Sequence, residues 1–190
     1  MKALTVFILC GGKSSDLQSD KGLVLFQGKP FIEHIIQAVL PLTQKIKLVT
    51  TTSEYDYLAY KKIPDIITDK GPLGGIYTAL MHSKTEFNLI LSCDIPLIST
   101  ELLSELISKH TDEAGVTVFA SASKIHSLIG IYSKKMLPLI KEAIDSDQLK
   151  VTDLLAKIPH QVITIEESEN FHLTNSSSAD ELNDFNINIS

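Results

Sequence analysis

The sequence predicts an α/β fold, a Rossmann-like α/β/α arrangement of three layers around a mostly parallel sheet. Two observations support this prediction. Apolar runs rich in β-branched residues alternate along the chain with longer segments of helical period, which is typical of parallel strands joined by crossover helices. Two of the runs, "LTVFIL" at residues 4–9 and "NLIL" at residues 88–91, show no regular alternation of apolar and polar residues. Such strands are expected to be buried on both faces of the sheet.

In the first half of the chain, strands are expected at residues 3–9, 45–51, 65–68 and 87–94. Helices are expected at about residues 30–40, 54–61, 76–82 and 99–110. The helix at 30–40 has its large apolar residues on one stripe, and Pro30 suits its first turn because an N–H group there needs no partner within the helix. Ser99 or Thr100 is expected to cap the last of these helices.

The second half of the chain is less regular. Its expected strands are residues 115–121, 126–133 and 161–166, and its expected helices are 134–144 and 151–158. The last segment, residues 175–190, has the composition of a short capped helix followed by a frayed tail. No internal repeat, long linker or low-complexity block divides the sequence. We therefore expect a single domain over residues 1–190.

Composition and charge disfavour several classes of function. The chain has 17 Lys and Arg against 23 Asp and Glu, a net charge of −6 at pH 7, whereas general nucleic-acid binding usually shows as a basic excess. No apolar stretch approaches the ~20 residues of a membrane span. The two cysteines have neither the number for a disulfide scaffold nor the spacing of a zinc site. We therefore expect a cytoplasmic protein that binds neither nucleic acid nor membranes.

A polar, glycine-containing loop, "CGGKSSDLQSDKG" at residues 10–22, follows the first strand. In the common doubly wound order this strand lies beside the strand at 87–94, and ligands bind beyond the carboxyl ends of both. Gly11 and Gly12 can turn sharply and expose amides to a phosphate, although two glycines also fit a plain turn. Lys21 supplies a mobile point charge suited to a polyphosphate. The spacing matches neither the dinucleotide fingerprint nor the Walker loop.

An acidic residue, Asp94 in "SCDIPLI", stands at the carboxyl end of the strand expected beside the first one. The predicted topology places it opposite the glycine loop, where a carboxylate can hold Mg²⁺ shared with substrate phosphates. A capping or turn aspartate is the alternative interpretation. Cys10 and Cys93 should lie near each other at the same edge, and we interpret them as small buried thiols.

A third segment, "TDKGPLGGI", places Asp69 at the end of a short expected strand. Gly74 and Gly75 in this segment allow close approach of either a ligand or a packed strand. Across the whole sequence, no serine, histidine and acid have the recognisable spacing of a hydrolytic triad. Hydrolysis through a protein nucleophile therefore finds little support.

Together and in this order, these segments resemble the molybdenum cofactor guanylyltransferases, within the wider group of nucleotidyltransferases. "LCGGKSSDLQSDKGL", followed by "GKPFIEHI", is similar to the family's opening motif. "DKGPLGGI", "SCDIPLIS", "HSLIGIYSKKMLPLI" and "TNSSSADEL" are similar to its later motifs. The similarity covers nearly the whole chain, and the ordered set is far more specific than any one motif.

The resemblance implies a nucleotide-diphospho-sugar-transferase-like fold with a nucleotide-binding part at about residues 1–98 and an acceptor-side part at about 99–185. It implies transfer of GMP from GTP to molybdopterin cofactor, with release of pyrophosphate, to give the guanine dinucleotide form. Mg²⁺ is the implied cofactor. Transient contact with molybdoenzymes or their chaperones is implied as well.

The resemblance also implies roles for single residues. Lys21 and Asp94 would be the catalytic residues, with Lys21 neutralising the triphosphate and Asp94 holding the metal. Asn175, in the tail motif, would contact the acceptor or metal region. The other nucleotide-binding residues would be Leu9, Cys10, Gly11, Gly12, Thr50 and Asp69.

Some positions depart from the family pattern. Asp16 stands where the family has an arginine, and a carboxylate close to a polyphosphate repels it, by on the order of a few kcal/mol at an effective dielectric of ~20. Thr50 stands in place of an asparagine associated with the guanine site. In the tail motif, Ser177 and Ala179 replace an asparagine and a proline.

These departures leave alternatives open. One is a related enzyme that uses CTP or another phosphorylated acceptor. A second is a catalytically weakened relative that binds nucleotide or cofactor without turnover. A hydride-transferring dehydrogenase is a distant further alternative, because the dinucleotide fingerprint is missing.

Overall fold

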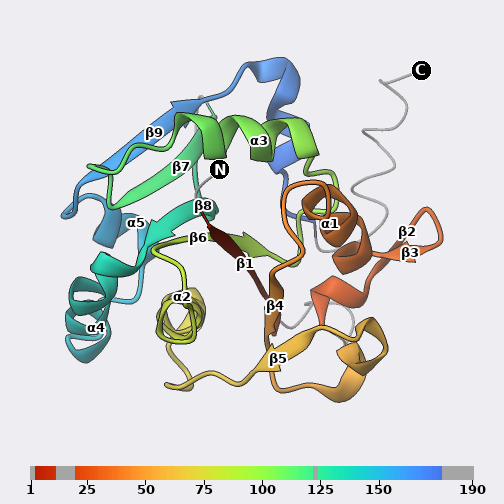
Figure 1. The fold of residues 1–190 in the computed structure, drawn as a ribbon, viewed down its shortest axis with the longest axis horizontal. Coiled ribbons are helices and arrows are strands. Elements are labelled where there is room, and N and C mark those ends of the chain that lie inside the picture. The colour runs from red at the N-terminus through yellow and green to blue at the C-terminus, as the bar shows by residue number, and fades with distance from the viewer. Residues whose placement is uncertain (1–2, 12–19, 122–123, 177–190) are drawn as a thin grey trace.

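A seven-stranded sheet forms the centre of the protein (Figure 1). The computed structural model describes residues 3–11, 20–121 and 124–176. The strand order is β5-β4-β1-β6-β8-β7-β9. The strands are β1 (Leu4–Leu9), β4 (Ile46–Val49), β5 (Lys61–Ile63), β6 (Phe87–Ser92), β7 (Val116–Ser121), β8 (Lys124–Ser133) and β9 (His160–Thr164). Strand β8 is antiparallel to both of its neighbours, and the other pairings are parallel. The predicted mostly parallel α/β fold is confirmed.

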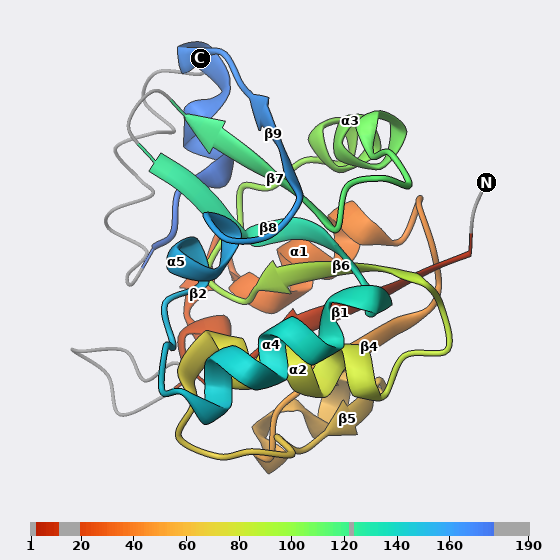
Figure 2. The same cartoon turned by 90° about the vertical axis from the view of Figure 1, so that its left-hand side faces the viewer.

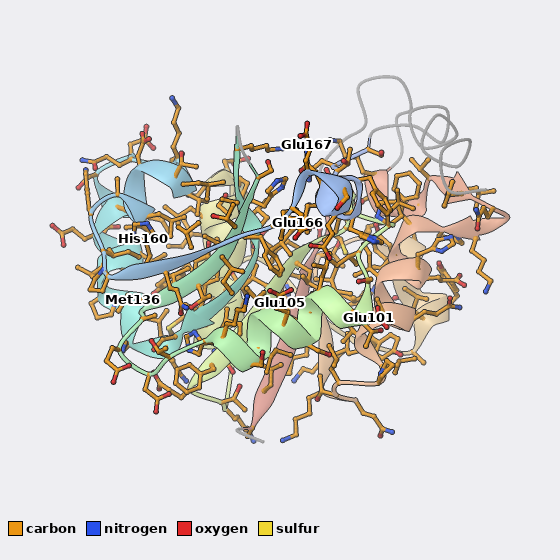
Figure 3. The ribbon with its side chains drawn as sticks, turned by 90° about the horizontal axis from the view of Figure 1, so that it is seen from above. Glu101, Glu105, Met136, His160, Glu166 and Glu167 are labelled. Atoms are coloured by element: carbon orange, nitrogen blue, oxygen red, sulfur yellow. The ribbon has the colours of Figure 1, made fainter. Side chains whose placement is uncertain are left out.

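Helices cover both faces of this sheet (Figures 1 and 2). The helices are α1 (Phe31–Val39), α2 (Gly71–Met81), α3 (Thr100–Lys109), α4 (Leu137–Asp145) and α5 (Val151–Leu155). Val6 and Ile8 of β1 belong to a buried cluster with α1 and α3, whereas Phe7 between them belongs to a second cluster with α2, α4 and α5. Because strand side chains alternate between faces, the apolar run in β1 supplies both cores. On α3, Glu101 and Glu105 lie on the outer surface (Figure 3).

Short elements connect these layers. They are the 3-10 helices η1 (Lys21–Leu23), η2 (Ser53–Leu58), η3 (Lys134–Met136) and η4 (Glu167–Leu173), and a hairpin of β2 (Leu25–Phe26) and β3 (Lys29–Pro30). Within the described residues, no helix has the length and apolar character needed to cross a membrane.

The sheet reverses its strand order between β1 and β6. From β1 the chain proceeds to β4 and β5 on one side, then crosses to β6 on the other side of β1. Leu9, the last residue of β1, lies beside Val49 of β4 and Ser92 of β6 in parallel register. The predicted pairing of the first strand with the strand at 87–94 is confirmed. The carboxyl ends of β1 and β6 therefore form a topological switch point, where ligands bind in folds of this kind.

Three sequence predictions in the first half are wrong in detail. The strand expected at 65–68 is instead β5 at Lys61–Ile63. The helix expected at 54–61 is a 3-10 helix that ends at Leu58, because Ala59 takes a left-handed conformation with φ 54°. Helix α2 starts at Gly71 rather than at 76, with a proline suited to its first turn. The helix expected after residue 175 falls largely outside the described residues.

Candidate active site

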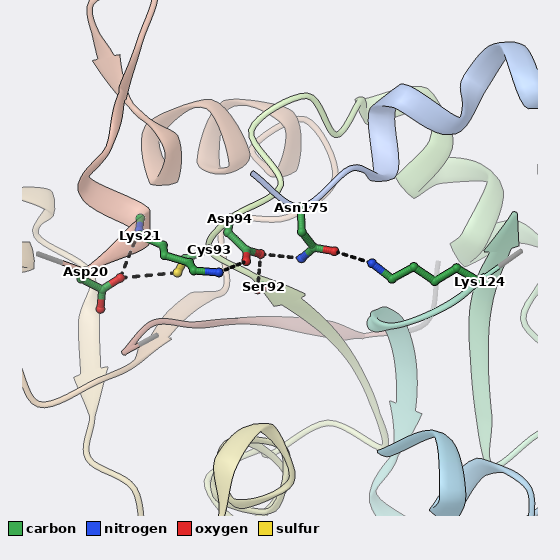
Figure 4. Close-up of polar contacts among 8 residues, drawn as sticks. Asp20, Lys21, Ser92, Cys93, Asp94, Lys124 and Asn175 are labelled. Carbon is green, nitrogen blue, oxygen red and sulfur yellow. Dashed lines mark hydrogen bonds and ion pairs between the residues drawn. The ribbon is translucent and has the colours of Figure 1, made fainter. Parts of the chain in front are cut away.

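Lys21 and Asp94 meet at the switch point (Figure 4). Lys21 begins η1, just after the loop that leaves β1, and Asp94 lies in the turn that follows β6. The Lys21 Nζ atom is 3.4 Å from Asp94 Oδ2, and the two side chains are 28% and 10% exposed. The sequence separates these residues by 73 positions. The fold therefore brings the two predicted catalytic residues together.

The Asp94 carboxylate is held in one orientation. Its Oδ1 atom accepts hydrogen bonds from Ser92 Oγ at 2.6 Å and from Asn175 Nδ2 at 2.7 Å. The backbone N–H of Ser176 donates to the Asp94 carbonyl at 2.8 Å, which fastens the tail segment to the end of β6. The other carboxylate oxygen, Oδ2, faces Lys21. Asn175 thus lies at the predicted site, next to the predicted metal ligand.

A second acid, Asp20, shapes the turn that carries Lys21. Its Oδ1 atom accepts from the Gly22 N–H at 3.0 Å, which caps η1, and from Tyr55 Oη at 2.6 Å. Tyr55 comes from η2 and is fully buried. Burial, with smaller contributions from Cys10, Cys93 and Asp20, raises the pKa of Tyr55. The phenol therefore stays protonated and remains a donor to Asp20.

The turn at Gly22 has no room for a side chain. A Cβ atom there would lie 2.5 Å from Tyr55 Oη and 3.0 Å from Cys93 Cβ. Close packing of η1 against the tyrosine and the end of β6 therefore favours glycine, because a Cβ atom 2.5 Å from the phenol oxygen would force one of them to move. This contact fixes the backbone next to Lys21.

The two cysteines lie side by side at the same edge. Cys93 N–H donates to the carbonyl of Leu9 at 3.2 Å, and Cys10 N–H donates to that of Val49 at 3.0 Å. A hydrogen bond with the Cys10 side chain, together with burial and the nearby acids Asp20 and Asp94, raises the pKa of Cys93 well above its usual value. Cys93 is therefore a protonated thiol rather than a nucleophile. The prediction of small buried thiols is confirmed for Cys93, whereas Cys10 is only partly buried.

The other residues predicted to bind nucleotide make no hydrogen bond or ion pair with the side chains of Lys21 or Asp94 within the described part of the chain. Leu9 packs its side chain against Gly75 of α2, where an added Cβ would lie 3.3 Å from the leucine. Gly75 therefore serves helix–strand packing. Gly11 is exposed and has φ 128°, a backbone conformation that favours glycine. Gly12 lies outside the described residues, as does Asp16.

Thr50 and Asp69 follow other strands at this edge. Thr50 is buried after β4; its N–H donates to the Ile63 carbonyl, and its Oγ1 accepts from Thr52 N–H at 3.3 Å. Asp69 is exposed in the turn before α2 and has φ 59°, a conformation that aspartate tolerates better than most residues. In the described part of the chain, Asp69 makes no hydrogen bond to the other predicted site residues.

Comparison with known proteins bears on what this site does. The family model of the MobA-like NTP transferase domain matches residues 6–162. A protein of Flavobacterium johnsoniae named as a probable molybdenum cofactor guanylyltransferase is 77% identical over 190 residues, 100% of each chain. The chain belongs to the MobA-like NTP transferase family. A Carboxydothermus hydrogenoformans protein with the same name is 34% identical over 167 residues, 88% of this chain and 84% of the other.

Solved structures of this transferase class share the fold. A molybdopterin-guanine dinucleotide biosynthesis protein A from Archaeoglobus fulgidus superposes with a TM-score of 0.79 and 19% identity, over 95% of each chain. This structural likeness confirms the fold class, whereas the family model and the 77% identical relative confirm the family resemblance inferred from the ordered motifs.

Sequence reasoning missed several residues that build this MobA-like site: Asp20, Tyr55, Ser92 and Lys124. Asp20 precedes the predicted lysine in "SDKG", and Ser92 lies two positions before Asp94 in the same strand, so adjacency to the motifs was an available signal for both. Lys124 lies two positions before "HSLIGIYSKKMLPLI", so adjacency to a motif was available for it as well. Tyr55 lies in a segment with no motif near it, and only the tertiary fold identifies it.

Proposed function

We propose that this MobA-like transferase moves GMP from GTP to molybdopterin cofactor and releases pyrophosphate. The meeting of Lys21 and Asp94 at the switch point between β1 and β6 is the observation that carries the proposal. A cation and a carboxylate side by side at such a crevice suit a metal-bound polyphosphate. The names of the relatives, which are called molybdenum cofactor guanylyltransferases, supply the choice of nucleotide and acceptor.

The chemistry requires position and charge rather than a protein nucleophile. An oxygen of the acceptor phosphate attacks the α-phosphorus of GTP, a new P–O bond forms, and the bond to the leaving pyrophosphate breaks. Lys21 neutralises charge on the triphosphate and on the departing pyrophosphate. The fixed turn around Asp20 and Gly22 limits the movement of its backbone, so the charge is positioned in advance.

The site fits Mg²⁺ that is shared with substrate. Asp94 is buried, with 7% of the whole residue exposed, and its Oδ1 atom accepts from two donors. No group of three or more His, Cys, Asp and Glu side chains suited to a metal occurs within the described residues. One carboxylate, with substrate phosphates and waters as the other ligands, is a usual Mg²⁺ environment. Asp94 would hold the ion, which supplies charge neutralisation at the reacting phosphates.

A pyrophosphate-release screen tests the proposal. The protein is assayed with Mg²⁺, molybdopterin and each of the four nucleoside triphosphates in turn. We expect release with GTP, and we expect Lys21→Ala to weaken triphosphate binding more than nucleoside binding. Lys109→Ala, which removes a charge from the far end of α3, is the matched control.

The other outcomes separate the alternatives. A clear preference for CTP would assign the enzyme to cytosine transfer. Nucleotide binding by calorimetry without pyrophosphate release from any of the four would indicate a binding protein and refute the transferase. Equal losses of triphosphate and nucleoside binding in Lys21→Ala would refute the role given to the lysine.

A further inference from the structure

A second lysine lies at the site on the side of Asp94 away from Lys21. Lys124 begins β8, and its Nζ donates to Asn175 Oδ1 at 3.2 Å. The same Asn175 side chain donates from Nδ2 to Asp94 Oδ1 at 2.7 Å. Figure 4 shows the resulting row of side chains, Lys21, Asp94, Asn175 and Lys124, with a cation at each end.

The positive charge of Lys124 has no carboxylate partner in the described part of the chain. Its partner there is the neutral amide of Asn175, whereas Lys70 and Lys109 each pair with an acid. Lys124 is exposed, so its ammonium group can be reached from solvent. An ammonium group has three N–H donors, and the amide takes only one of them. Among the described residues, Lys124 therefore keeps both its charge and two donors for another group.

The charge of Lys124 affects a neighbouring histidine, His126. Burial is the main cause that lowers the pKa of His126 to about 4, and the charge of Lys124 is the next. His126 follows two positions after Lys124 on β8 and is 6% exposed. The imidazole therefore stays neutral near pH 7, and it contributes no positive charge that would take the place of the lysine.

The position of Lys124 matches the geometry that the reaction needs. Strand β8 lies beyond β6, on the opposite side from β1 and η1. The proposed reaction brings two anionic groups together, and an acceptor phosphate approaching a triphosphate is repelled unless a separate cation neutralises it. Lys21 lies on the nucleotide side of Asp94. Lys124 is the lysine at the other end of the row.

We propose that Lys124 binds the phosphate of the acceptor and holds it on the side of Asp94 opposite to Lys21. This inference rests on the proposed transfer of GMP to a phosphorylated pterin. Asn175 positions Lys124, because the donation from its Nδ2 to Asp94 fixes the amide and turns Oδ1 toward the lysine. Lys124 thereby makes the enzyme specific for an acceptor that carries a phosphate.

Binding measurements with and without the acceptor phosphate test this role. The full-length protein is loaded with Mg²⁺ and α,β-methylene GTP, which blocks turnover, and titrated with molybdopterin or with its dephosphorylated form. The variants are Lys124→Gln, Lys124→Arg and, as a charge-matched control, Lys109→Gln. Steady-state GMP transfer gives KM for each substrate in parallel.

Lys124→Gln should weaken molybdopterin binding by roughly 10- to 100-fold, the usual range for loss of a charge-assisted hydrogen bond. The dissociation constants for the dephosphorylated pterin and for the GTP analogue should change by less than about twofold, which is within the scatter of surface substitutions. Lys124→Arg should recover most of the affinity, because it keeps the charge. Lys109→Gln should behave as wild type.

Four results would overturn the inference. Equal weakening of both pterins by Lys124→Gln would mean that the lysine only supports local structure. A matching loss of affinity for the GTP analogue would place it on the nucleotide instead. A wild-type protein that transfers no GMP and binds no molybdopterin would refute the proposed function as well, whereas an active wild type with an unaffected Lys124→Gln variant would refute the inference alone.

Discussion

Replacing Asp94 by asparagine changes one charge at the centre of the site and leaves its shape intact. The new Oδ1 can still accept from Ser92 and Asn175, as the carboxylate does. The new Nδ2 group then takes the place of Oδ2, which lies 3.4 Å from the Lys21 ammonium. The ion pair is replaced by two hydrogen-bond donors that face each other. We expect the variant to be folded but less stable, and unable to support Mg²⁺-dependent turnover.

The size of the stability effect follows from the exposure of the pair. Fully exposed ion pairs contribute about 0–1 kcal/mol, whereas removal of one partner from a buried pair costs about 3–5 kcal/mol. Lys21 and Asp94 are 28% and 10% exposed, which places them between these limits. We expect Asp94→Asn to lower the free energy of unfolding by about 1–2 kcal/mol, or Tm by about 2–8 °C for a chain of this length.

The effect on activity should be larger than the effect on stability. Loss of a metal that neutralises the reacting phosphates removes several kcal/mol of transition-state stabilisation, a decrease in kcat/KM of roughly 10³-fold or more. Tm is measured by calorimetry and turnover by pyrophosphate release. Glu105→Gln is the control. Glu105 and Lys109 form a more exposed ion pair at 2.5 Å, four positions apart on α3, and such a pair should contribute only about 0.3–0.5 kcal/mol to stability.

Two results would contradict this reasoning. If Asp94→Asn keeps Mg²⁺-dependent turnover within about tenfold of wild type, Asp94 does not hold the metal. If its Tm falls no further than that of Glu105→Gln, the contact with Lys21 makes no net contribution to stability, although it is much less exposed than the control pair.

Three further variants test the supports of the site. Tyr55→Phe removes the 2.6 Å hydrogen bond to Asp20 and should lower the free energy of unfolding in urea by about 1.5–3 kcal/mol. An unchanged urea midpoint would contradict a stabilising role for this hydrogen bond. Gly22→Ala forces a Cβ against Tyr55 Oη and should lower the free energy of unfolding by about 1–3 kcal/mol in the same measurement. An unchanged value would mean that the turn moves freely. His126 has its pKa lowered from 6.5 to about 4, so the unfolded chain takes up its proton first as the pH falls. Stability should therefore decline between about pH 6.5 and pH 4, by on the order of 2 kcal/mol, and unfolding curves of His126→Gln should show a flatter decline over that range.

The parts of the fold that the sequence predicted well depend on simple periodic patterns. β1 and β6 are mainly apolar runs buried between two helical layers, and burial on both faces leaves few alternatives to a central parallel strand. Once β1 and β6 are neighbours, the switch-point rule places Lys21 near Asp94 without any further information. The approximate place of the site therefore followed from the strand order.

The errors arose where the local sequence and the tertiary position conflict. β5 contains two lysines, Lys61 and Lys62, and so lacks the pattern of a buried strand, but it lies at the edge of the sheet, where charged side chains are tolerated. The more apolar residues 65–68 form the loop before α2 instead. Gly74 and Gly75 are poor helix formers, yet they lie within α2 because close packing against residue 67 and Leu9 requires small residues there.

The detailed contacts of the site were beyond sequence reasoning because they join distant segments. Tyr55 contacts Asp20 across 35 positions, and Asn175 contacts Asp94 across 81. Neither pair belongs to a common local motif, so no spacing in the sequence connects them. Their meeting depends on where η2 and the segment after η4 cross the carboxyl edge of the sheet.

The order of charges along this edge fits the proposed reaction, in which one carboxylate lies between two anionic substrates. Lys21 and Lys124 would repel each other if they shared one side of the site. Asp94 lies between them, and its charge offsets part of this repulsion, while Asn175 occupies Oδ1 and leaves Oδ2 to Lys21. An amide is suited to the position next to Lys124, because a second carboxylate there would neutralise the lysine and repel an incoming phosphate. The neutrality of Asn175 is therefore as necessary to the proposed acceptor site as the charge of Lys124.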